Sequence, residues 1–295
     1  MTMLRYFLFP VLGLILLTAC RGRSGNTDTR PHITVTMEPQ RYFVDAIAGE
    51  KVHVTTMVPG GSSPETYDPI PQQLVKLNNS QAYLRIGYIG FELAWMERLI
   101  SNAPHLKVFD LSEGIDLIRA DDHVHYDEHG CAHTHEIEPH VWNSAANALI
   151  IAKNTFDALV SLDQINESYY RARYDSLCQH IHHTDSLVRA LVAEPGTPRT
   201  FMIYHPALSY FARDYGFEQI AIEDHGKEPS PAHMKYLIDR CRAEGVRTIF
   251  IQPEFDTRNA QAIAEQTGAE VVRVNPLNYR WDEEMLNIAR QLTRH

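Results

Sequence analysis

The sequence predicts an α/β protein made of two α/β lobes with parallel sheets, bridged by one long helix, with a ligand cleft between the lobes. From residue 32 onward, short β-rich runs alternate with helical stretches, which is the pattern of parallel sheets covered by helices. Residues 167–192 contain no Gly or Pro and carry apolar residues at mostly helical spacing, which predicts a single long helix. The 295 residues, of which 44% are hydrophobic, are enough to bury two cores.

The elements before the long helix begin with a strand at residues 33–37, a helix at residues 41–48 and a strand at residues 51–58. Further helices are expected at residues 71–79, 90–100 and 143–162. The first of these three opens on a proline, which the first turn of a helix tolerates.

A Pro-Gly pair at residues 195–196 ends the long helix, and the alternation then resumes to the end of the chain. Strands are expected at residues 200–204, 219–222, 246–251 and 270–274, and helices at residues 206–215, 231–244, 257–267 and 282–293. We detect no internal sequence repeat.

The first twenty residues have the pattern of an export signal. Arg5 supplies a positive charge, residues 7–17 form an apolar run, and Leu-Thr-Ala-Cys at residues 17–20 is a small-residue cleavage site. As a helix, the apolar run spans about half of the ~30 Å hydrocarbon core, so it is a poor transmembrane segment. Because Leu-x-Ala-Cys resembles the bacterial lipobox, we expect Cys20 to be lipidated and to anchor an exported protein in the cell envelope, in the periplasm or on the outer face of the cytoplasmic membrane.

These features divide the chain into five segments. We expect a lipoprotein signal peptide, a linker, an N-terminal α/β lobe that includes a His-rich loop at residues 121–135, a bridging helix and a C-terminal α/β lobe. Their boundaries are residues 1–19, 20–31, 32–166, 167–194 and 195–295.

Charge and motif content exclude several classes of function. The chain has 37 acidic and 27 basic residues, a net charge of −10, and this argues against nucleic-acid binding, which needs a basic surface. It contains no P-loop, no G-x-S-x-G elbow and no G-x-G-x-x-G motif, so we expect no enzyme. Cys131, Cys178 and Cys241 allow one disulfide or none, and the sequence does not choose between them.

The His-rich loop is the most unusual segment. It carries His123, His125, His129, His133 and His135 among acidic residues. No Lys or Arg occurs from residue 120 to residue 152. Imidazole is a good ligand for zinc and other transition metals, so we expect these histidines to make weak accessory metal contacts.

Three phrases resemble the solute-binding proteins of bacterial ABC importers for zinc and manganese, a family also described as adhesin-like lipoproteins. Residues 58–69 (Val-Pro-Gly-Gly-Ser-Ser-Pro-Glu-Thr-Tyr-Asp-Pro) stand where the family shows a glycine turn and then Pro-His-x-Tyr. Residues 138–142 (Glu-Pro-His-Val-Trp) match the family's Asp-Pro-His-x-Trp, and residues 205–212 are similar to its His-x-x-x-x-Tyr-Phe-Ala. The resemblance extends over residues 32–295.

The resemblance implies a metal ion held between the lobes. His140 and His205 match ligand histidines of the family, whereas Glu65 stands at the position of its usual first histidine. Two neutral imidazoles and one carboxylate form a standard three-ligand zinc set. The fourth ligand stays open between water, a loop histidine and the following residues: Asn275, which stands where many relatives have Asp, Glu223 and Asp224.

The expected function is that of a high-affinity extracytoplasmic zinc receptor that delivers Zn²⁺ to the permease of an ABC importer. We expect a monomer that meets the membrane only through its N-terminal lipid and does not bind nucleic acid. A manganese or iron receptor of the same importer class, with Mn²⁺ in the site, is the nearest alternative. A surface adhesin or zinc buffer, and a zinc hydrolase that uses an open fourth position, are alternatives from other classes.

Overall fold

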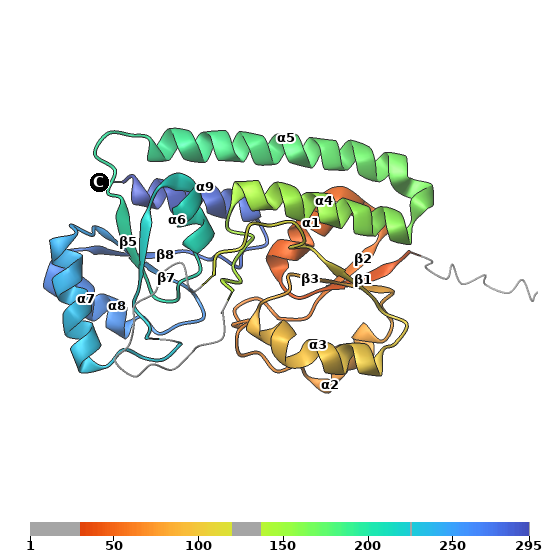
Figure 1. The fold of residues 1–295 in the computed structure, drawn as a ribbon, viewed down its shortest axis with the longest axis horizontal. Coiled ribbons are helices and arrows are strands. Elements are labelled where there is room, and N and C mark those ends of the chain that lie inside the picture. Colours follow the sequence, from red (N-terminus) through yellow and green to blue (C-terminus); the bar gives the residue numbers. More distant parts are fainter. Residues whose placement is uncertain (1–29, 120–136, 225, 295) are drawn as a thin grey trace, which may run out of the picture. The chain divides into compact units, whose positions relative to one another are not determined.

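Two four-stranded parallel sheets carry the fold of the computed structural model, which describes residues 30–119, 137–224 and 226–294 (Figure 1). The strand order is β2-β1-β3-β4 in the first sheet and β6-β5-β7-β8 in the second, so the two sheets have the same topology. The predicted α/β fold with two parallel sheets is therefore confirmed. The strands are β1 (His32–Val35), β2 (His53–Thr56), β3 (Ala82–Arg85), β4 (Lys107–Asp110), β5 (Thr200–Ile203), β6 (Glu218–Ala221), β7 (Thr248–Ile251) and β8 (Glu270–Arg273).

The central strands are buried on both faces, as parallel sheets require. Along β5, Phe201 and Ile203 pack into one hydrophobic cluster, whereas Met202 lies in a second cluster on the opposite face. In β1, Ile33 and Val35 face the first of these clusters. This alternation follows from the two-residue period of a strand and gives each sheet two covered faces.

Helices cover both faces of each sheet (Figure 1). The first sheet lies between a layer of α1 (Glu38–Ala48) and α4 (Ala145–Leu162) and a layer of α2 (Pro71–Leu77) and α3 (Gly90–Asn102). The second sheet lies between a layer of α6 (Ser209–Tyr215) and α9 (Trp281–Leu292) and a layer of α7 (Pro231–Ala243) and α8 (Arg258–Thr267). Two short 3₁₀ turns are η1 (Gly49–Lys51) and η3 (Gln164–Asn166).

The long helix α5 (Glu167–Val192) links the two lobes, as predicted. It packs against α1 and α4 of the first lobe and against α9 of the second lobe, along the top of Figure 1. Its inward face buries Leu177, Ile181 and Val188 in a hydrophobic cluster that also contains residues of both sheets. One continuous core therefore joins the lobes behind the cleft.

The structure corrects the sequence-based elements in two places. Strands β3 and β4 have no counterpart among the predicted strands, although β3 is a central strand that pairs with both β1 and β4. The helix expected at residues 206–215 begins only at Ser209, because residues 205–208 form a turn in which the Ala207 N–H donates to the His205 carbonyl.

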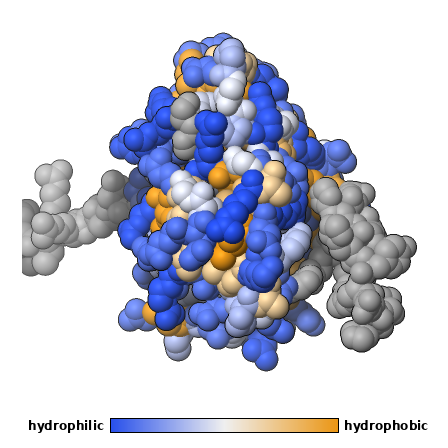
Figure 2. Space-filling model, turned by 90° about the vertical axis from the view of Figure 1, so that its left-hand side faces the viewer, coloured by the Kyte–Doolittle hydropathy of each residue, from blue (hydrophilic) through white to orange (hydrophobic). Residues whose placement is uncertain are grey.

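A membrane-spanning helix has to be both long and apolar. None of the described helices combines the length and the apolar character needed to cross a membrane. Figure 2 shows the end of the molecule that lies at the left in Figure 1, where hydrophilic side chains dominate around a central group of apolar ones.

Candidate metal centre

Glu65 lies in the connection between β2 and α2, against the first turn of α3. The Gly90 N–H, at the start of α3, donates a hydrogen bond of 3.0 Å to Glu65 Oε2. A Cβ atom at Gly90 would lie 2.4 Å from the Glu65 carbonyl oxygen, so only glycine fits there. The free N–H groups at a helix start attract a carboxylate. Glu65 Oε1 is buried and accepts no hydrogen bond within the described ranges.

His140 lies between residue 137, where the described chain resumes, and α4. The residue is 5% exposed, and its Nδ1–H donates to the carboxylate of Glu138. The other Glu138 oxygen, Oε2, accepts a hydrogen bond of 3.0 Å from the hydroxyl of Ser209 in the second lobe. Because a carboxylate only accepts hydrogen bonds, Glu138 holds the hydrogen on Nδ1 and turns Nε2 toward the cleft.

His205 follows β5 directly, and a carboxylate orients it in the same way. Its Nδ1–H donates to Glu223 Oε1 at 2.9 Å. The Gln252 side chain brackets its backbone: Oε1 accepts from the His205 N–H at 3.3 Å and Nε2 donates to the His205 carbonyl at 2.6 Å. The Phe255 ring stacks on the imidazole with 5.3 Å between ring centres. The ring is therefore fixed with Nε2 facing His140.

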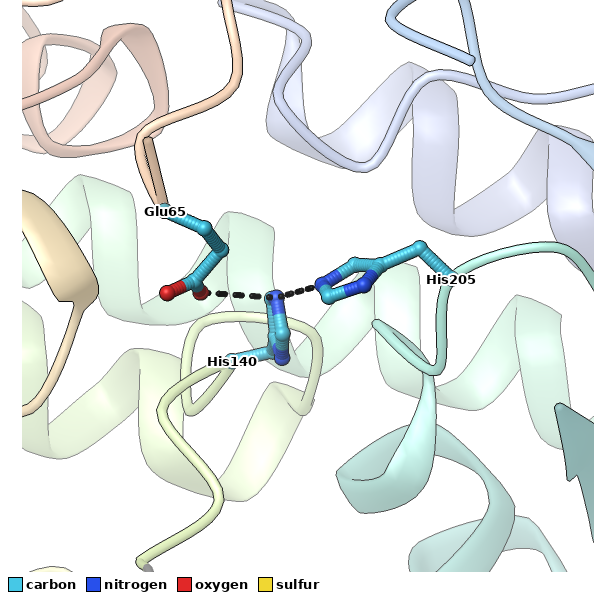
Figure 3. Close-up of side chains that lie close together, drawn as sticks. All are labelled: Glu65, His140 and His205. Atoms are coloured by element: carbon cyan, nitrogen blue, oxygen red, sulfur yellow. Dashed lines mark hydrogen bonds and ion pairs between the residues drawn. The ribbon is translucent and has the colours of Figure 1, made fainter. Parts of the chain in front are cut away.

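The three candidate ligand atoms converge on one point between the lobes (Figure 3). The two Nε2 atoms are 3.2 Å apart, and His140 Nε2 is 3.7 Å from Glu65 Oε1. All three atoms lie within 4.8 Å of one another. Ligands at about 2.0–2.1 Å from a tetrahedral zinc ion are about 3.4 Å apart, a value that lies between the 3.2 and 3.7 Å spacings.

The electrostatics of this cluster demand a positive charge at its centre. Both Nδ1 atoms carry the hydrogens, so both Nε2 atoms present lone pairs, and the third atom is a carboxylate oxygen. Three acceptors this close repel one another unless a proton or a metal ion lies among them. The arrangement can therefore hold either a proton shared between the imidazoles or a cation.

The pKa values of the Glu138–His140 pair follow from this arrangement. Burial by itself raises the pKa of Glu138 and lowers the pKa of His140. The charge attraction and hydrogen bonds between the two side chains outweigh burial, and Glu65 and Glu223 add negative charge near His140. The pKa of Glu138 is therefore below its ordinary value and the pKa of His140 above it, which favours a proton on His140 when no metal is bound.

A small cavity of about 20 Å³ lies beside the three side chains, with room for one ion or one water molecule. Its wall includes Trp142 and Glu254 in addition to the three candidate ligands. Burial raises the pKa of the Glu254 carboxyl, and the neighbouring His205 offsets only part of this rise. A larger hollow of about 1090 Å³, lined in the described ranges by residues of both lobes, shares Glu65, His140 and His205 with the small cavity. An ion can therefore reach the cluster from this side.

The structure brings together the three residues singled out in the sequence and separates them from other candidates. Asn275 does not line the cavity, because its Oδ1 accepts a hydrogen bond of 3.1 Å from the Leu277 N–H. Glu223 lies behind His205, on Nδ1, so it orients a candidate ligand. Asp224 lines only the larger hollow.

The remaining candidates from the sequence lie elsewhere in the fold or outside the described residues. Cys20, Cys131 and the signal peptide lie outside them, as do the loop histidines His123, His125, His129, His133 and His135. Cys178 and Cys241 are free thiols. His180 on α5 lies away from the cluster and pairs with Asp282 at 2.8 Å.

The groups that position the ligands could not be singled out from the sequence as readily as the ligands themselves. Glu138 is one of several acidic residues near the His-rich loop, although it stands two residues before His140 in the phrase that resembles the family. Gln252 and Glu254 follow a buried strand, and polar residues at the carboxyl end of a parallel strand are a signal of a site. Gly90 carries no signal, because its role depends on contact with a residue far away in the sequence.

Comparison with known proteins identifies the family. A family model described as zinc-uptake complex component A, periplasmic (ZnuA) matches residues 33–292. The chain belongs to this family. It is 25% identical over 293 residues to the high-affinity zinc uptake system protein ZnuA of Bacillus subtilis (strain 168), covering 94% of this chain and 90% of that protein. It is also 25% identical over 273 residues to the manganese ABC transporter substrate-binding lipoprotein PsaA of Streptococcus anginosus, covering 88% of this chain and 85% of that protein.

Solved structures agree with this assignment. A crystal structure of ZnuA matches with a TM-score of 0.82 at 32% identity, covering 90% of this chain and 98% of that chain. This ZnuA-family protein is thus a metal-binding receptor of an ABC importer and a protein of the cell envelope, and the resemblance found in the sequence is confirmed. Members of the family are solute-binding receptors rather than enzymes.

Proposed function

We propose that this ZnuA-family protein is a high-affinity zinc receptor that binds the ion at Glu65, His140 and His205 and delivers it to the permease of an ABC importer. The observation that carries the proposal is the pair of Nε2 atoms 3.2 Å apart that face a carboxylate oxygen, Glu65 Oε1, which accepts no hydrogen bond from the described residues. Orienting carboxylates on both Nδ1 atoms support it, because metal-bound histidines usually donate their other N–H to such a partner.

The donor set favours zinc over manganese. Two imidazoles and one carboxylate are a common zinc set, whereas manganese prefers sites with more oxygen ligands. The relatives include one named for zinc and one named for manganese, so the ion has to be decided from the chemistry of this chain. Glu65 replaces a histidine with one oxygen ligand. Because manganese prefers oxygen ligands, Mn²⁺ is the ion expected to compete with Zn²⁺ for this site.

Delivery requires that the ion can be released. Glu65 and His140 belong to the first lobe and His205 to the second, so the ligand set is divided between them. A small shift of one lobe against the other lengthens the distance from the ion to one side of the set and lowers the affinity. We propose that the permease promotes this shift when the receptor docks on it.

Titration of the metal-stripped protein tests the proposal. We expect one tight equivalent of Zn²⁺ per chain, with Mn²⁺ a weak competitor, and we expect His140→Ala and His205→Ala to abolish tight binding. His180→Ala, an exposed histidine on α5, is the matched control. Tight binding that persists in both ligand variants would disprove the site. Tighter binding of Mn²⁺ than of Zn²⁺ would be consistent with the same ligand residues but would identify Mn²⁺ as the bound ion.

Deleting residues 121–135 separates a transport receptor from a zinc buffer or adhesin in which the His-rich loop is the binding element. We expect the tight site to survive the deletion and only weaker sites to disappear. Loss of the tight site on deletion would favour the buffer. Zinc-dependent turnover of ester or peptide substrates would instead favour a hydrolase, and we expect none.

The lipid anchor at Cys20 stays a prediction, as do the segment boundaries drawn from the sequence. We expect a Cys20→Ala variant to be released from the membrane fraction while keeping the zinc affinity of the unmodified chain. Retention of this variant in the membrane fraction would contradict the anchor.

A further inference from the structure

The wall of the small cavity contains few side chains that can complete a metal site. Trp142 Nε1 donates to the Pro276 carbonyl, and both ends of the Gln252 amide bind the His205 backbone. The Ser63 hydroxyl accepts a hydrogen bond of 3.3 Å from the Glu65 N–H. These groups are engaged and uncharged. Beyond the three candidate ligands, Glu254 is the remaining ionisable side chain among the described residues that line the cavity.

Glu254 stands at the same edge of the second sheet as His205. Strands β5 and β7 are parallel neighbours in register, with Ile203 opposite Phe250, so the residues that follow both strands emerge side by side. His205 follows β5, and Glu254 follows β7. The residues on either side of this region, Gln252 and Phe255, already contact His205 through hydrogen bonds and ring stacking.

The Glu254 carboxylate is not committed to a neighbouring side chain. Burial raises the pKa of this carboxyl, whereas its own backbone N–H and His205 lower it. It is not one of the three residues whose ligand atoms lie within 4.8 Å of one another, so it has to rotate to reach the centre. Rotation of a partly exposed Glu side chain costs little compared with a metal–carboxylate bond.

We infer that Glu254 is the fourth protein ligand of the bound ion and swings onto it from the β7 end once Glu65, His140 and His205 have captured it. The inference rests on the proposed function, because it needs those three ligands. Glutamate oxygen is an ordinary zinc ligand, so a second carboxylate suits the ion. It also completes four-coordination, as in closed zinc sites.

This fourth ligand divides the set evenly between the lobes. The first lobe supplies Glu65 and His140, and the second supplies His205 and Glu254. The last ligand to bind is then also the first that can leave, because its side chain lies outside the cluster of the other three ligand atoms when no ion is bound. Glu254 would therefore control how fast the ion is released.

Spectroscopy with Co²⁺, combined with zinc competition, tests the inference on the full chain. Tetrahedral Co²⁺ bound by four protein ligands has intense visible absorption bands, and replacement of one carboxylate by water changes their position and intensity. We expect Glu254→Gln to change the Co²⁺ spectrum, to weaken Zn²⁺ binding at least tenfold, and to speed Zn²⁺ release to a chelator. Glu265→Gln, an exposed carboxylate on the adjacent helix α8, is the matched control and should change none of these.

The outcomes separate this inference from the proposed function. If Glu254→Gln and Glu254→Ala both keep the Co²⁺ spectrum and the zinc affinity of the unmodified chain, Glu254 is not a ligand, while the three-residue site stands. If His140→Ala and His205→Ala keep tight binding, the proposed function is wrong, and the inference on Glu254 falls with it. Thermal melting of each variant without metal shows whether the fold is intact; an unchanged Tm assigns any loss of affinity to the site.

Discussion

The two lobes have the same sheet topology, but their candidate metal-binding side chains follow different strands. In the second lobe, His205 and the inferred ligand Glu254 follow β5 and β7, the two central strands. In the first lobe, Glu65 follows β2 and His140 precedes α4 after β4, and both of these strands lie at the sheet edges. The same sheet topology therefore positions candidate ligands in two ways: after central strands in the second lobe and after edge strands in the first.

The two positions differ in how many contacts outside the sheet are needed to hold the side chain in place. A residue that closely follows a buried central strand is positioned by the sheet, and the His205 backbone is also held by Gln252 while Glu223 and Phe255 fix its ring. Glu65 lies nine residues beyond the end of β2, in a connection without regular structure, and is held by the Gly90 N–H. We therefore expect the first-lobe ligands to depend more on contacts outside the sheet.

The largest loss of zinc affinity is expected when a ligand imidazole is removed, whichever lobe carries it. His140→Ala and His205→Ala should each weaken binding by more than about a hundredfold, the upper end of the effect of losing an outer partner of a ligand. Competition with a zinc chelator of known affinity measures this. A loss at only one of the two positions would mean that one lobe binds the ion alone.

A smaller loss, of about 10- to 100-fold, is expected when the orienting carboxylates are changed. Glu138→Gln and Glu223→Gln keep the shape of the side chain but lose its charge, so each imidazole becomes less basic and less firmly oriented. Chelator competition, with Glu265→Gln as control, measures both. Because His205 is also held by Gln252, the Glu223 variant should lose less than the Glu138 variant, and the reverse order would contradict the comparison of the lobes.

The pH dependence of zinc binding should follow the proton on His140. The pKa of His140 is above its ordinary value because the charges of Glu138, Glu65 and Glu223 outweigh burial. Zinc must displace that proton, so the apparent affinity should fall about tenfold for each pH unit below this pKa and level off above it. Titrations at several pH values measure the slope. In Glu138→Gln, the fall should begin at a lower pH; an unchanged profile would mean that Glu138 does not set the pKa.

A loss of zinc affinity of roughly tenfold is expected when Gly90 is changed. Gly90 holds Glu65 in the first lobe, and no glycine has this role for His205 among the described residues of the second lobe. In Gly90→Ala, the added Cβ would lie 2.4 Å from the Glu65 carbonyl and 2.8 Å from its Oε2, so Glu65 must move away from the centre. Gly60→Ala is the matched control, because a Cβ there meets nothing within 4 Å. Equal affinities of the two variants would show that Glu65 tolerates the displacement.

The smallest effect on zinc affinity, less than about threefold, is expected at Glu92, which affects the stability of the first lobe instead. Its buried carboxylate accepts hydrogen bonds from Thr36 and the Ile86 N–H, and burial raises its pKa to about 7. The folded chain then binds a proton that the unfolded chain releases, so the free energy of unfolding should fall as pH rises from about 4.5 to about 7, by on the order of 3 kcal/mol. Glu92→Gln should remove this dependence in denaturant titrations. A profile unchanged by the substitution would contradict the raised pKa.

The fold was largely predictable because most elements carry strong local signals, and the exceptions show where those signals end. Strand β4 contains only Val108 and Phe109 as apolar residues, and β3 (Ala-Tyr-Leu-Arg) contains no β-branched residue, so neither has a pattern that stands out locally. Both are strands because β3 pairs with β1, β4 pairs with β3, and α3 covers one face of the sheet there. Without them, the shared topology of the two sheets could not be seen.

The candidate site also has a part that the sequence predicts and a part that only the structure shows. The sequence singled out Glu65, His140 and His205 because short phrases around them resemble a family. Their spatial supports, Gly90 for Glu65 and Gln252 for His205, depend on contacts between residues 25 and 47 positions apart, which a reading of local pattern does not detect.

The shared core behind the cleft prevents the two lobes from unfolding independently. Trp142 donates to the Pro276 carbonyl, and Trp281 donates to the Trp142 carbonyl, so buried indoles connect the halves through their backbones. Neither half can melt while the other stays intact without exposing this apolar contact to water. Heat, denaturant and proteases should therefore meet a single cooperative body, and a mutation in either half lowers the stability of the whole receptor.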